Sequence, residues 1–188
     1  MGELKIGRAV AAALHQAISE LLPTRIQFYE EWLTLDRIRE GTVSRAKVGA
    51  VLSFLRQESS GYDQVVERAG RYTGVWTFDT KPRFCEGFLQ RMPQPIRVWI
   101  ALRRGASLIK GLHGGGRLRW ATRRGVVVAE IQRSLFCEVR VKAREPLCRF
   151  YAAVLEYCLE SVKLSCNIEL IRCRGVGDKG CELRIDPK

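Results

Sequence analysis

The amino-acid sequence predicts an α+β domain, in which a helical first half is followed by a mostly antiparallel sheet with one inserted helix. Two observations predict this class. In the first half, apolar residues recur at steps of three and four, the period of a helix, whereas after position 116 they alternate with polar residues, as in a half-buried strand. Helices and strands segregated in this way pack as helices on a sheet. The 188 residues suit one domain, with a helical half, 1–94, and a second region, 95–188.

The helices are predicted from apolar stripes that end at helix-stop or capping residues. They cover about residues 6–21, 44–58, 62–76, 84–88 and 96–112. Pro23 follows the first of these helices, and Thr42 or Ser44 can cap the second. Three consecutive glycines at 114–116 follow the last, as is typical of a helix end.

The second region contains segments with the alternating pattern of strands. They cover residues 117–120, 126–131, 135–141, 168–173 and 181–185. Residues 122–125 form the turn of a first hairpin, and residues 174–180 form the loop of a closing hairpin. A helix from Pro146 to about Val162 is inserted between the third and fourth strands. We therefore expect hairpins that form an antiparallel sheet covered by helices.

The chain is strongly basic. It has 32 Lys and Arg against 20 Asp and Glu, a net charge of +12, and no acid between Glu86 and Glu130, where nine positive charges occur. Such a field attracts acidic proteins, anionic lipid headgroups or nucleic acid. The predicted basic face consists of Arg97, Arg103, Arg104, Lys110, Arg117, Arg119, Arg123 and Arg124. The alternative is a solvated face that keeps the protein soluble. No helix-turn-helix or base-stacking motif accompanies these residues, so sequence-specific nucleic-acid binding is not predicted.

Composition excludes other classes of protein. With 46% hydrophobic and 28% charged residues the chain is globular in composition, and no run reaches the roughly twenty apolar residues of a membrane span. The apolar start is interrupted by His15, Gln16 and Glu20, so it is interpreted as a helix and not as a signal peptide. Seven cysteines, an odd number, favour free thiols and a cytoplasmic location.

Three of the cysteines form a candidate metal site. Cys173 and Cys181 lie at the facing ends of two predicted strands around a glycine-rich loop, and Cys148 begins the helix expected to pack over this hairpin. Three thiolates are a good donor set for zinc. The alternative is that Cys148 is an ordinary buried residue on the apolar stripe of its helix.

The same segments resemble a known family. The motifs are Ser134-Leu-Phe-Cys137, Pro146-Leu-Cys148 before a helix, and Cys173 with Gly177-Asp178 and Cys181 before a last strand. Together they are similar to the 4-vinyl-reductase domain, over about residues 95–188. That domain belongs to a superfamily with the haem-type nitric-oxide sensors (H-NOX) and the Golgi-tethering TRAPP subunits.

The resemblance implies an interior pocket for hydrophobic small molecules, a binding or sensor role and frequent dimerisation. In phenol-sensing members the matching cysteines hold a structural zinc, which assigns Cys148, Cys173 and Cys181 to that role. A glutamate three residues before the second cysteine completes that site, but this chain has Leu170 there. Glu169 is about 13 Å of regular strand away from Cys173, so either a bulge intervenes or the fourth ligand differs.

A pocket between helices and sheet is expected to be lined by aromatic side chains. The candidates are Tyr72, Trp76, Phe84, Phe88, Trp99 and Trp120. Aromatic residues at helical spacing are otherwise ordinary core residues.

Three hypotheses for function follow. The leading one is a non-enzymatic module that binds a hydrophobic small molecule, contains zinc and forms a homodimer. The second is an interaction or tethering protein that uses its basic face. The third is an enzyme that modifies a tetrapyrrole vinyl group, against which no nucleotide-binding glycine fingerprint follows a strand, so no nucleotide cofactor is predicted. A haem group would need His15 or His113 as its imidazole ligand.

Overall fold

The computed structural model describes residues 6–58, 61–78, 91–112, 115–139 and 141–187. The helices are α1 (Arg8–Leu21), η1 (Pro23–Arg25), α2 (Ile26–Glu30), α3 (Leu35–Glu40), α4 (Arg45–Leu55), α5 (Gly61–Phe78), α7 (Gln94–Leu112), α8 (Arg149–Glu160) and η2 (Arg174–Val176). The strands are β1 (Arg117–Arg123), β2 (Val126–Gln132), β3 (Cys166–Arg172) and β4 (Cys181–Pro187). The predicted α+β class is confirmed.

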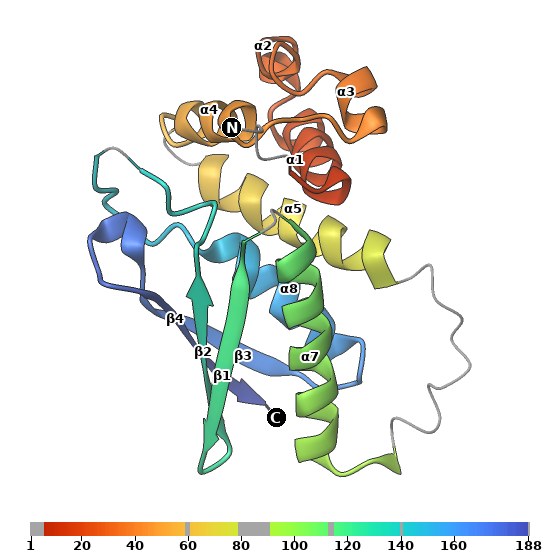
Figure 1. Ribbon diagram of the computed structural model, residues 1–188, viewed down its shortest axis with the longest axis vertical. Helices are drawn as coiled ribbons and strands as arrows, with labels where there is room; N and C mark the ends of the chain where they lie inside the picture. The colour runs from red at the N-terminus through yellow and green to blue at the C-terminus, as the bar shows by residue number, and fades with distance from the viewer. Residues whose placement is uncertain (1–5, 59–60, 79–90, 113–114, 140, 188) are drawn as a thin grey trace.

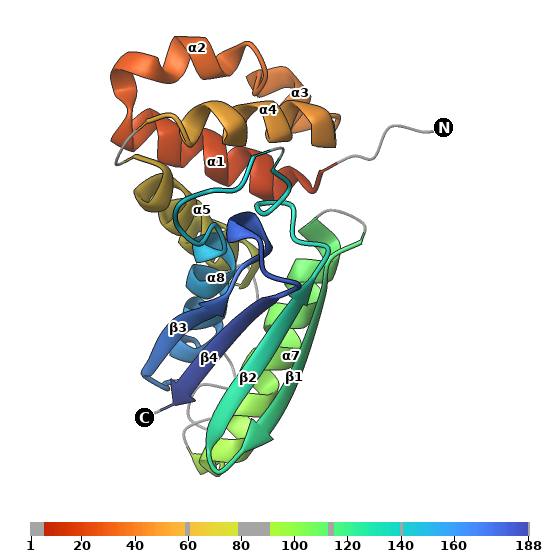
Figure 2. The ribbon, with the colours of Figure 1, turned by 90° about the vertical axis from the view of Figure 1, so that its left-hand side faces the viewer.

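The described strands form one antiparallel sheet in the order β1-β2-β4-β3. Figures 1 and 2 show α7 and α8 on one face of this sheet, α5 across α8, and α1–α4 together at one end of the molecule. The tip of the β1–β2 hairpin lies at the opposite end, beside the N-terminal end of α7 in both views. Among the described residues, no helix covers the other face of the sheet.

Helices α5 and α8 approach each other closely because α5 has glycines at the contact. A Cβ on Gly70 would lie 2.5 Å from the carbonyl oxygen of Phe150, and one on Gly74 would lie 2.6 Å from the ring of Tyr157. Phe136 stacks on Phe150 with ring centroids 4.3 Å apart, and both side chains are fully buried. The core therefore joins α5 and α8 to the loop that follows β2.

One predicted strand is wrong. Residues 135–139 form an irregular loop, in which Leu135, Phe136 and Cys137 are all buried instead of alternating between core and solvent. The backbone N–H of Cys137 donates to Oγ of Ser134 at 3.2 Å, which closes a turn inside this loop. Because consecutive apolar side chains are all enclosed, the apolar run does not indicate a half-buried strand.

Other boundaries differ in smaller ways. The first hairpin turns on Arg124 and Gly125 alone, and not over residues 122–125. The predicted cap at Ser44 is confirmed, since its Oγ accepts from the N–H of Lys47 at 3.4 Å. Helices η1, α2 and α3 occupy residues 23–40, where the sequence shows no regular period and predicts no helix. The helix expected at residues 84–88 lies outside the described residues. No described helix is long and apolar enough to cross a membrane.

Candidate functional site

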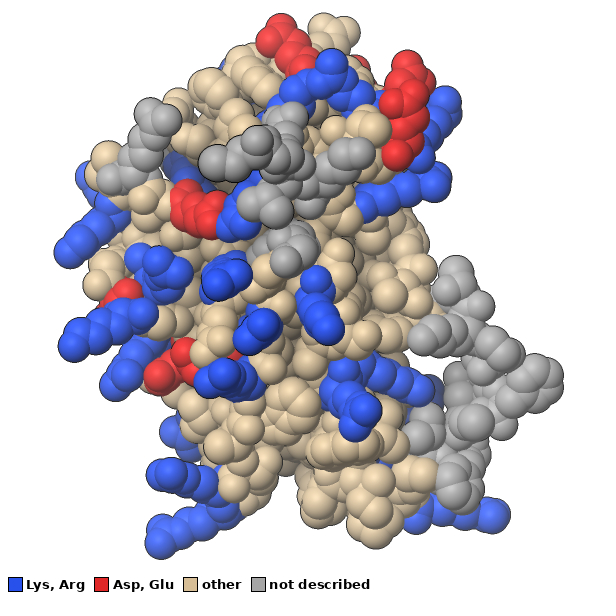
Figure 3. All heavy atoms as spheres, in the orientation of Figure 1, with Lys and Arg blue, Asp and Glu red and all other residues tan. Residues whose placement is uncertain are grey.

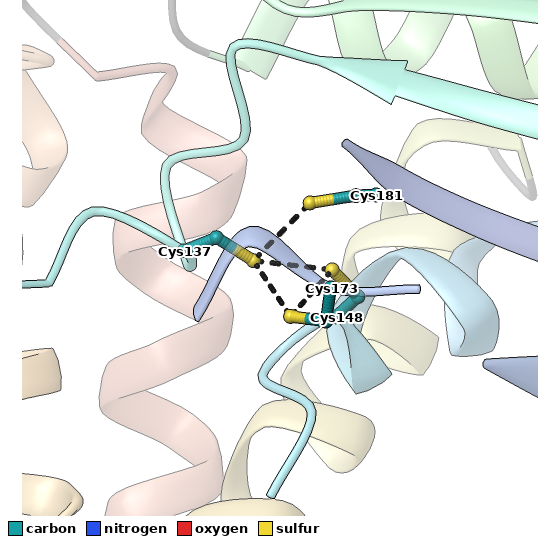
Figure 4. Close-up of side chains that lie close together, drawn as sticks. All are labelled: Cys137, Cys148, Cys173 and Cys181. Atoms are coloured by element: carbon teal, nitrogen blue, oxygen red, sulfur yellow. Dashed lines mark hydrogen bonds between the residues drawn. The ribbon is translucent and has the colours of Figure 1, made fainter. Parts of the chain in front are cut away.

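Four buried cysteines converge from separate segments of the second region. Cys137 comes from the loop after β2, Cys148 precedes α8, Cys173 precedes η2, and Cys181 begins β4. Figure 4 shows their side chains pointing toward one another. All four are free thiols, and their sulfur atoms lie within 4.8 Å of one another. The structure thus brings together the three predicted cysteines and adds Cys137.

The spacing of the sulfurs is close to that of a tetrahedral thiolate site. The Sγ–Sγ distance is 3.1 Å for Cys137–Cys148, 3.4 Å for Cys137–Cys173, and 3.5 Å for both Cys148–Cys173 and Cys137–Cys181. Zinc–sulfur bonds of about 2.3 Å in a tetrahedron require sulfurs about 3.8 Å apart. Small movements of the side chains would therefore allow all four sulfurs to ligate one ion.

Backbone N–H groups donate to two of the sulfurs. Cys173 Sγ accepts from the N–H of Leu147 at 3.2 Å and from that of Gly175 at 3.3 Å. Cys181 Sγ accepts from the N–H of Arg174 at 3.5 Å. Hydrogen bonds of this kind favour the thiolate over the thiol, which is the form that binds a metal. The loop around η2 therefore supplies outer-sphere donors of the kind that support metal ligands.

The four thiols share protons unequally. Hydrogen bonds from Cys137 and Cys148, and then from Cys181, lower the pKa of Cys173, and hydrogen bonds from Cys137 and Cys148 also lower the pKa of Cys181. The pKa of Cys148 is raised, first by its contact with Cys137. The site therefore concentrates negative charge on Cys173 and Cys181.

Glu169 does not take part in this cluster. It is exposed on β3 and is paired across the sheet with Arg184. The bulge in this strand pair lies between Leu170 and Arg172, and it does not bring Glu169 to the cysteines. Cys137 provides the fourth donor instead. The sequence contained a signal for it, because Cys137 belongs to the motif that resembles the 4-vinyl-reductase domain and the family's glutamate is missing.

Helix α4 contacts the residues on both sides of Cys137. Arg56 donates from Nη2 to the carbonyl oxygen of Phe136 at 3.0 Å. Arg45 donates two hydrogen bonds to the carboxylate of Glu138. The loop that carries this thiol is therefore attached to the helical half by two arginines.

The start of α5 makes a similar pair of contacts around Cys148. Tyr62 donates its hydroxyl hydrogen to the carbonyl oxygen of Leu147 at 3.4 Å, and Arg149 donates from Nε to Oδ2 of Asp63 at 3.0 Å. Two of the four thiols thus lie on segments whose flanking residues are bonded to the α4–α5 region.

The described aromatic candidates for a pocket lie in separate places. Tyr72 and Trp76 stack on α5 with ring centroids 5.4 Å apart, and Trp76 is 40% exposed. Trp99 is 49% exposed on α7, and Trp120 is half-buried on β1. Phe84 and Phe88 lie outside the described residues.

An open groove of about 490 Å³ lies between the end of α1 and α5. Tyr72 lines it together with charged side chains that include Glu67 and Arg68. The hydroxyl of Tyr72 donates to Glu20 of α1 at 2.6–2.7 Å. Hydrogen bonds from Gln16, and then from Tyr72, lower the pKa of Glu20. The polar lining of this groove does not suit a hydrophobic molecule.

The residues of the predicted basic face divide into two groups. Arg97 donates to the carbonyl oxygens of Val162 and Lys163, and Arg104 donates to Oγ of Ser161. These two arginines therefore attach α7 to the end of α8. The exposed members are Arg103, Lys110, Arg117, Arg119, Arg123 and Arg124.

Comparison with known families and structures agrees with this geometry. Residues 127–187 match the model of the 4-vinyl-reductase domain, a range that includes all four clustered cysteines. The resemblance to this domain is confirmed over that range, shorter than the expected 95–188. A comparison with curated proteins gave no match.

Solved structures share the fold over most of the chain. The phenol-responsive sensory domain of the transcription activator PoxR with phenol has 15% identity and a TM-score of 0.55, covering 76% of this chain and 74% of its own. An H-NOX protein from S. oneidensis has 11% identity and a TM-score of 0.60, covering 97% and 99%. A trafficking protein particle complex subunit 3 from Naegleria fowleri, covalently bound to palmitic acid, has 16% identity and a TM-score of 0.51, covering 77% and 92%.

Proposed function

From the family match over residues 127–187 and the fold shared with ligand-sensing domains, we propose that this chain is a small-molecule sensor module that contains a structural zinc ion. The observation that carries the proposal is the cluster of Cys137, Cys148, Cys173 and Cys181. Four buried thiols aimed at one point, with backbone N–H donors on two of them, suit a closed structural site. A catalytic zinc site would keep one position open.

The role of the zinc is to fix the C-terminal hairpin against the rest of the fold. The four thiols come from segments that are otherwise loops or element ends, and each must be deprotonated to bind. When bound, the ion supplies cross-links among these segments and no redox chemistry. The proposed ligands hold the loop after β2, the start of α8 and the start of β4 in one place.

The proposed ligand is a hydrophobic small molecule held between the helices and the sheet. Two proteins of this fold support the choice of chemistry, since PoxR binds phenol and the trafficking subunit carries palmitic acid. Haem is a less suitable ligand for the described residues. His15 lies at the α1–α2 contact with its Nε2 3.2 Å from Oε1 of Glu30, and His113 lies outside the described residues.

Native mass spectrometry of the freshly purified chain, with metal analysis, tests this proposal. One zinc ion per chain and an additional small organic mass are expected, together with a homodimer. The matched variants are Cys148→Ser, which should lose the metal, and Cys166→Ser, which should retain it because Cys166 lies outside the cluster. A metal-free wild-type chain, or iron in place of zinc, would contradict the zinc assignment.

Binding of small molecules is tested separately with phenol and palmitic acid as probes. A compound that binds only the folded chain raises its melting temperature in proportion to its occupancy. We expect at least one apolar probe to produce such a rise and a charged analogue of similar size to produce none. If no apolar compound is retained or bound, the sensor assignment is wrong even where zinc is present.

A further inference from the structure

A surface at a distance from the four cysteines carries exposed basic side chains that form no ion pair with a described acidic residue. We call it the basic surface. It consists of Arg103, Lys110, Arg117, Arg119, Arg123 and Arg124, on α7, β1 and the hairpin turn. Elsewhere in the described chain, arginines such as Arg71 and Arg149 are paired with carboxylates. Figure 3 shows Lys and Arg gathered over the β1–β2 hairpin and α7, with few acidic side chains among them.

Large apolar side chains are exposed beside these charges. Ile96 is 46% exposed and Trp99 is 49% exposed, and both lie on the outward side of α7 near its N-terminal end. The guanidinium of Arg103 lies 5.1 Å from the ring centroid of Trp99. Because the hairpin tip lies beside this end of α7, one end of the molecule presents both arginines and apolar groups (Figures 1 and 2).

The hairpin tip has an arginine where the backbone favours other residues. Arg124 has a φ of 50° and Gly125 a φ of 81°, the left-handed conformation of a two-residue turn. Asn, Asp or Gly is usual at the first of these positions, because a longer side chain costs conformational energy there. A departure from local preference is expected at functional positions. It indicates that the charge of Arg124 at this tip has a use.

We propose that the basic surface docks this protein on an anionic lipid bilayer, with Trp99 and Ile96 at the level of the headgroups. Lipid phosphates and nucleic-acid phosphates would both attract the arginines. The exposed Trp and Ile decide between them, because an indole beside an arginine is favoured where water meets acyl chains. Contact with a phosphate backbone gives no comparable gain for an exposed isoleucine. This role is additional to the proposed sensing of a small molecule and does not depend on zinc.

Vesicle flotation with purified full-length protein tests the proposal. Binding is expected to phosphatidylcholine vesicles that contain phosphatidylglycerol, and not to vesicles of phosphatidylcholine alone, and it should weaken as sodium chloride is raised. The double variant Arg123→Gln, Arg124→Gln should bind about 30-fold more weakly, given the contribution of each basic residue at an anionic surface. Trp99→Ser should weaken binding at low and high salt alike, since it removes an apolar contact.

The matched control is Arg37→Gln, Arg39→Gln on α3, which removes the same charge from the opposite end of the molecule. It should bind as the wild type does. Equal binding by the Arg123 and Arg124 variant, or equal binding to neutral vesicles, would overturn the proposal. So would binding of duplex DNA or RNA that matches vesicle binding in strength and is unaffected by Trp99→Ser, because the surface would then recognise nucleic acid.

Discussion

Cys158 lies on the buried side of α8, with its sulfur 3.7 Å from the position that a Cβ on Gly105 would take. Burial raises the pKa of this thiol to about 12, and the nearby Arg104 opposes the shift only in part. The folded chain therefore holds the thiol proton more tightly than the unfolded chain does. The resulting stability is complete below the ordinary thiol pKa, and it is lost as the pH rises toward the folded value.

This thiol gives a prediction for alkaline stability. Between about pH 9 and about pH 12 the wild-type free energy of unfolding should fall by about 1.4 kcal/mol per pH unit through Cys158 alone. Cys158→Ala lacks this titration, so its free energy of unfolding should fall less steeply over the same range. Urea unfolding at a series of pH values measures both slopes. Identical slopes would show that the thiol is not protected from ionisation.

The role of Cys137 is tested by Cys137→Ser. Apparent binding of a structural zinc ion by four ligands is worth about 12 kcal/mol, so loss of one thiolate should cost about 3 kcal/mol, or roughly a hundredfold in affinity. Competition with a chromogenic chelator measures this change. Cys166→Ser is the control, because Cys166 is half-buried outside the cluster. If Cys137→Ser retains zinc as the wild type does, the remaining three cysteines hold the ion without it.

At the scale of elements, glycines set the distance between α5 and α8. Gly70→Ala would place a Cβ 2.5 Å from the carbonyl oxygen of Phe150 and 2.9 Å from Cβ of Ala153. We expect it to lower the free energy of unfolding by about 1–3 kcal/mol, because backbone must move to admit the methyl group. Gly49→Ala in α4 has no atom within 4 Å and should instead add about 0.5–1 kcal/mol. Urea denaturation of both variants checks the contrast, which equal effects would contradict.

The sequence predicted the long elements and missed the short ones for a physical reason. Helices α1, α4, α5, α7 and α8 each bury an apolar stripe several turns long, so their period is visible. Helices α2 and α3 have five and six residues, too few for a period to emerge. Residues 135–139 have an apolar run that is also typical of a strand, and nothing in the sequence reveals that this run is enclosed on all sides.

The metal site was predictable in part for a related reason. Cys173 and Cys181 are joined by a short loop, so their proximity follows from local sequence. Cys148 could be placed by its position at a helix start. Cys137 lies on an irregular loop whose path depends on the packing of Phe136 against Phe150. Nothing in the spacing of residues gives that path, although the family motif includes Cys137 and the family's glutamate is missing.

At the scale of the whole molecule, the arginines of α4 connect the helical half to the metal loop. Arg56→Met would remove the hydrogen bond to the carbonyl oxygen of Phe136 and leave that acceptor without it. We expect a loss of about 1–3 kcal/mol in the free energy of unfolding and a faster release of zinc to a chelator. Arg103→Met is the control, since Arg103 lies on the basic surface. An unchanged rate of zinc release would show that the two parts are independent.

Removal of the metal tests how far its effect extends. An ion that binds only the folded chain, present at about a hundred times its dissociation constant, adds about 2.7 kcal/mol. For a domain of this size, its removal by a chelator should lower the melting temperature by about 10 °C. Hydrogen exchange should quicken first in β4 and residues 134–138, which the cysteines hold together, and later in α1, which packs on α5.

Two variants locate the origin of this response. Cys166→Ser should lose as much melting temperature on chelation as the wild type, because its four clustered thiols are intact. Cys148→Ser should begin at the lower temperature and show no further change, because it lacks a ligand before the chelator is added. A drop of equal size in Cys148→Ser would mean that the chelator acts elsewhere. If exchange instead quickens uniformly through the chain, the metal stabilises the domain as one unit and not the hairpin first.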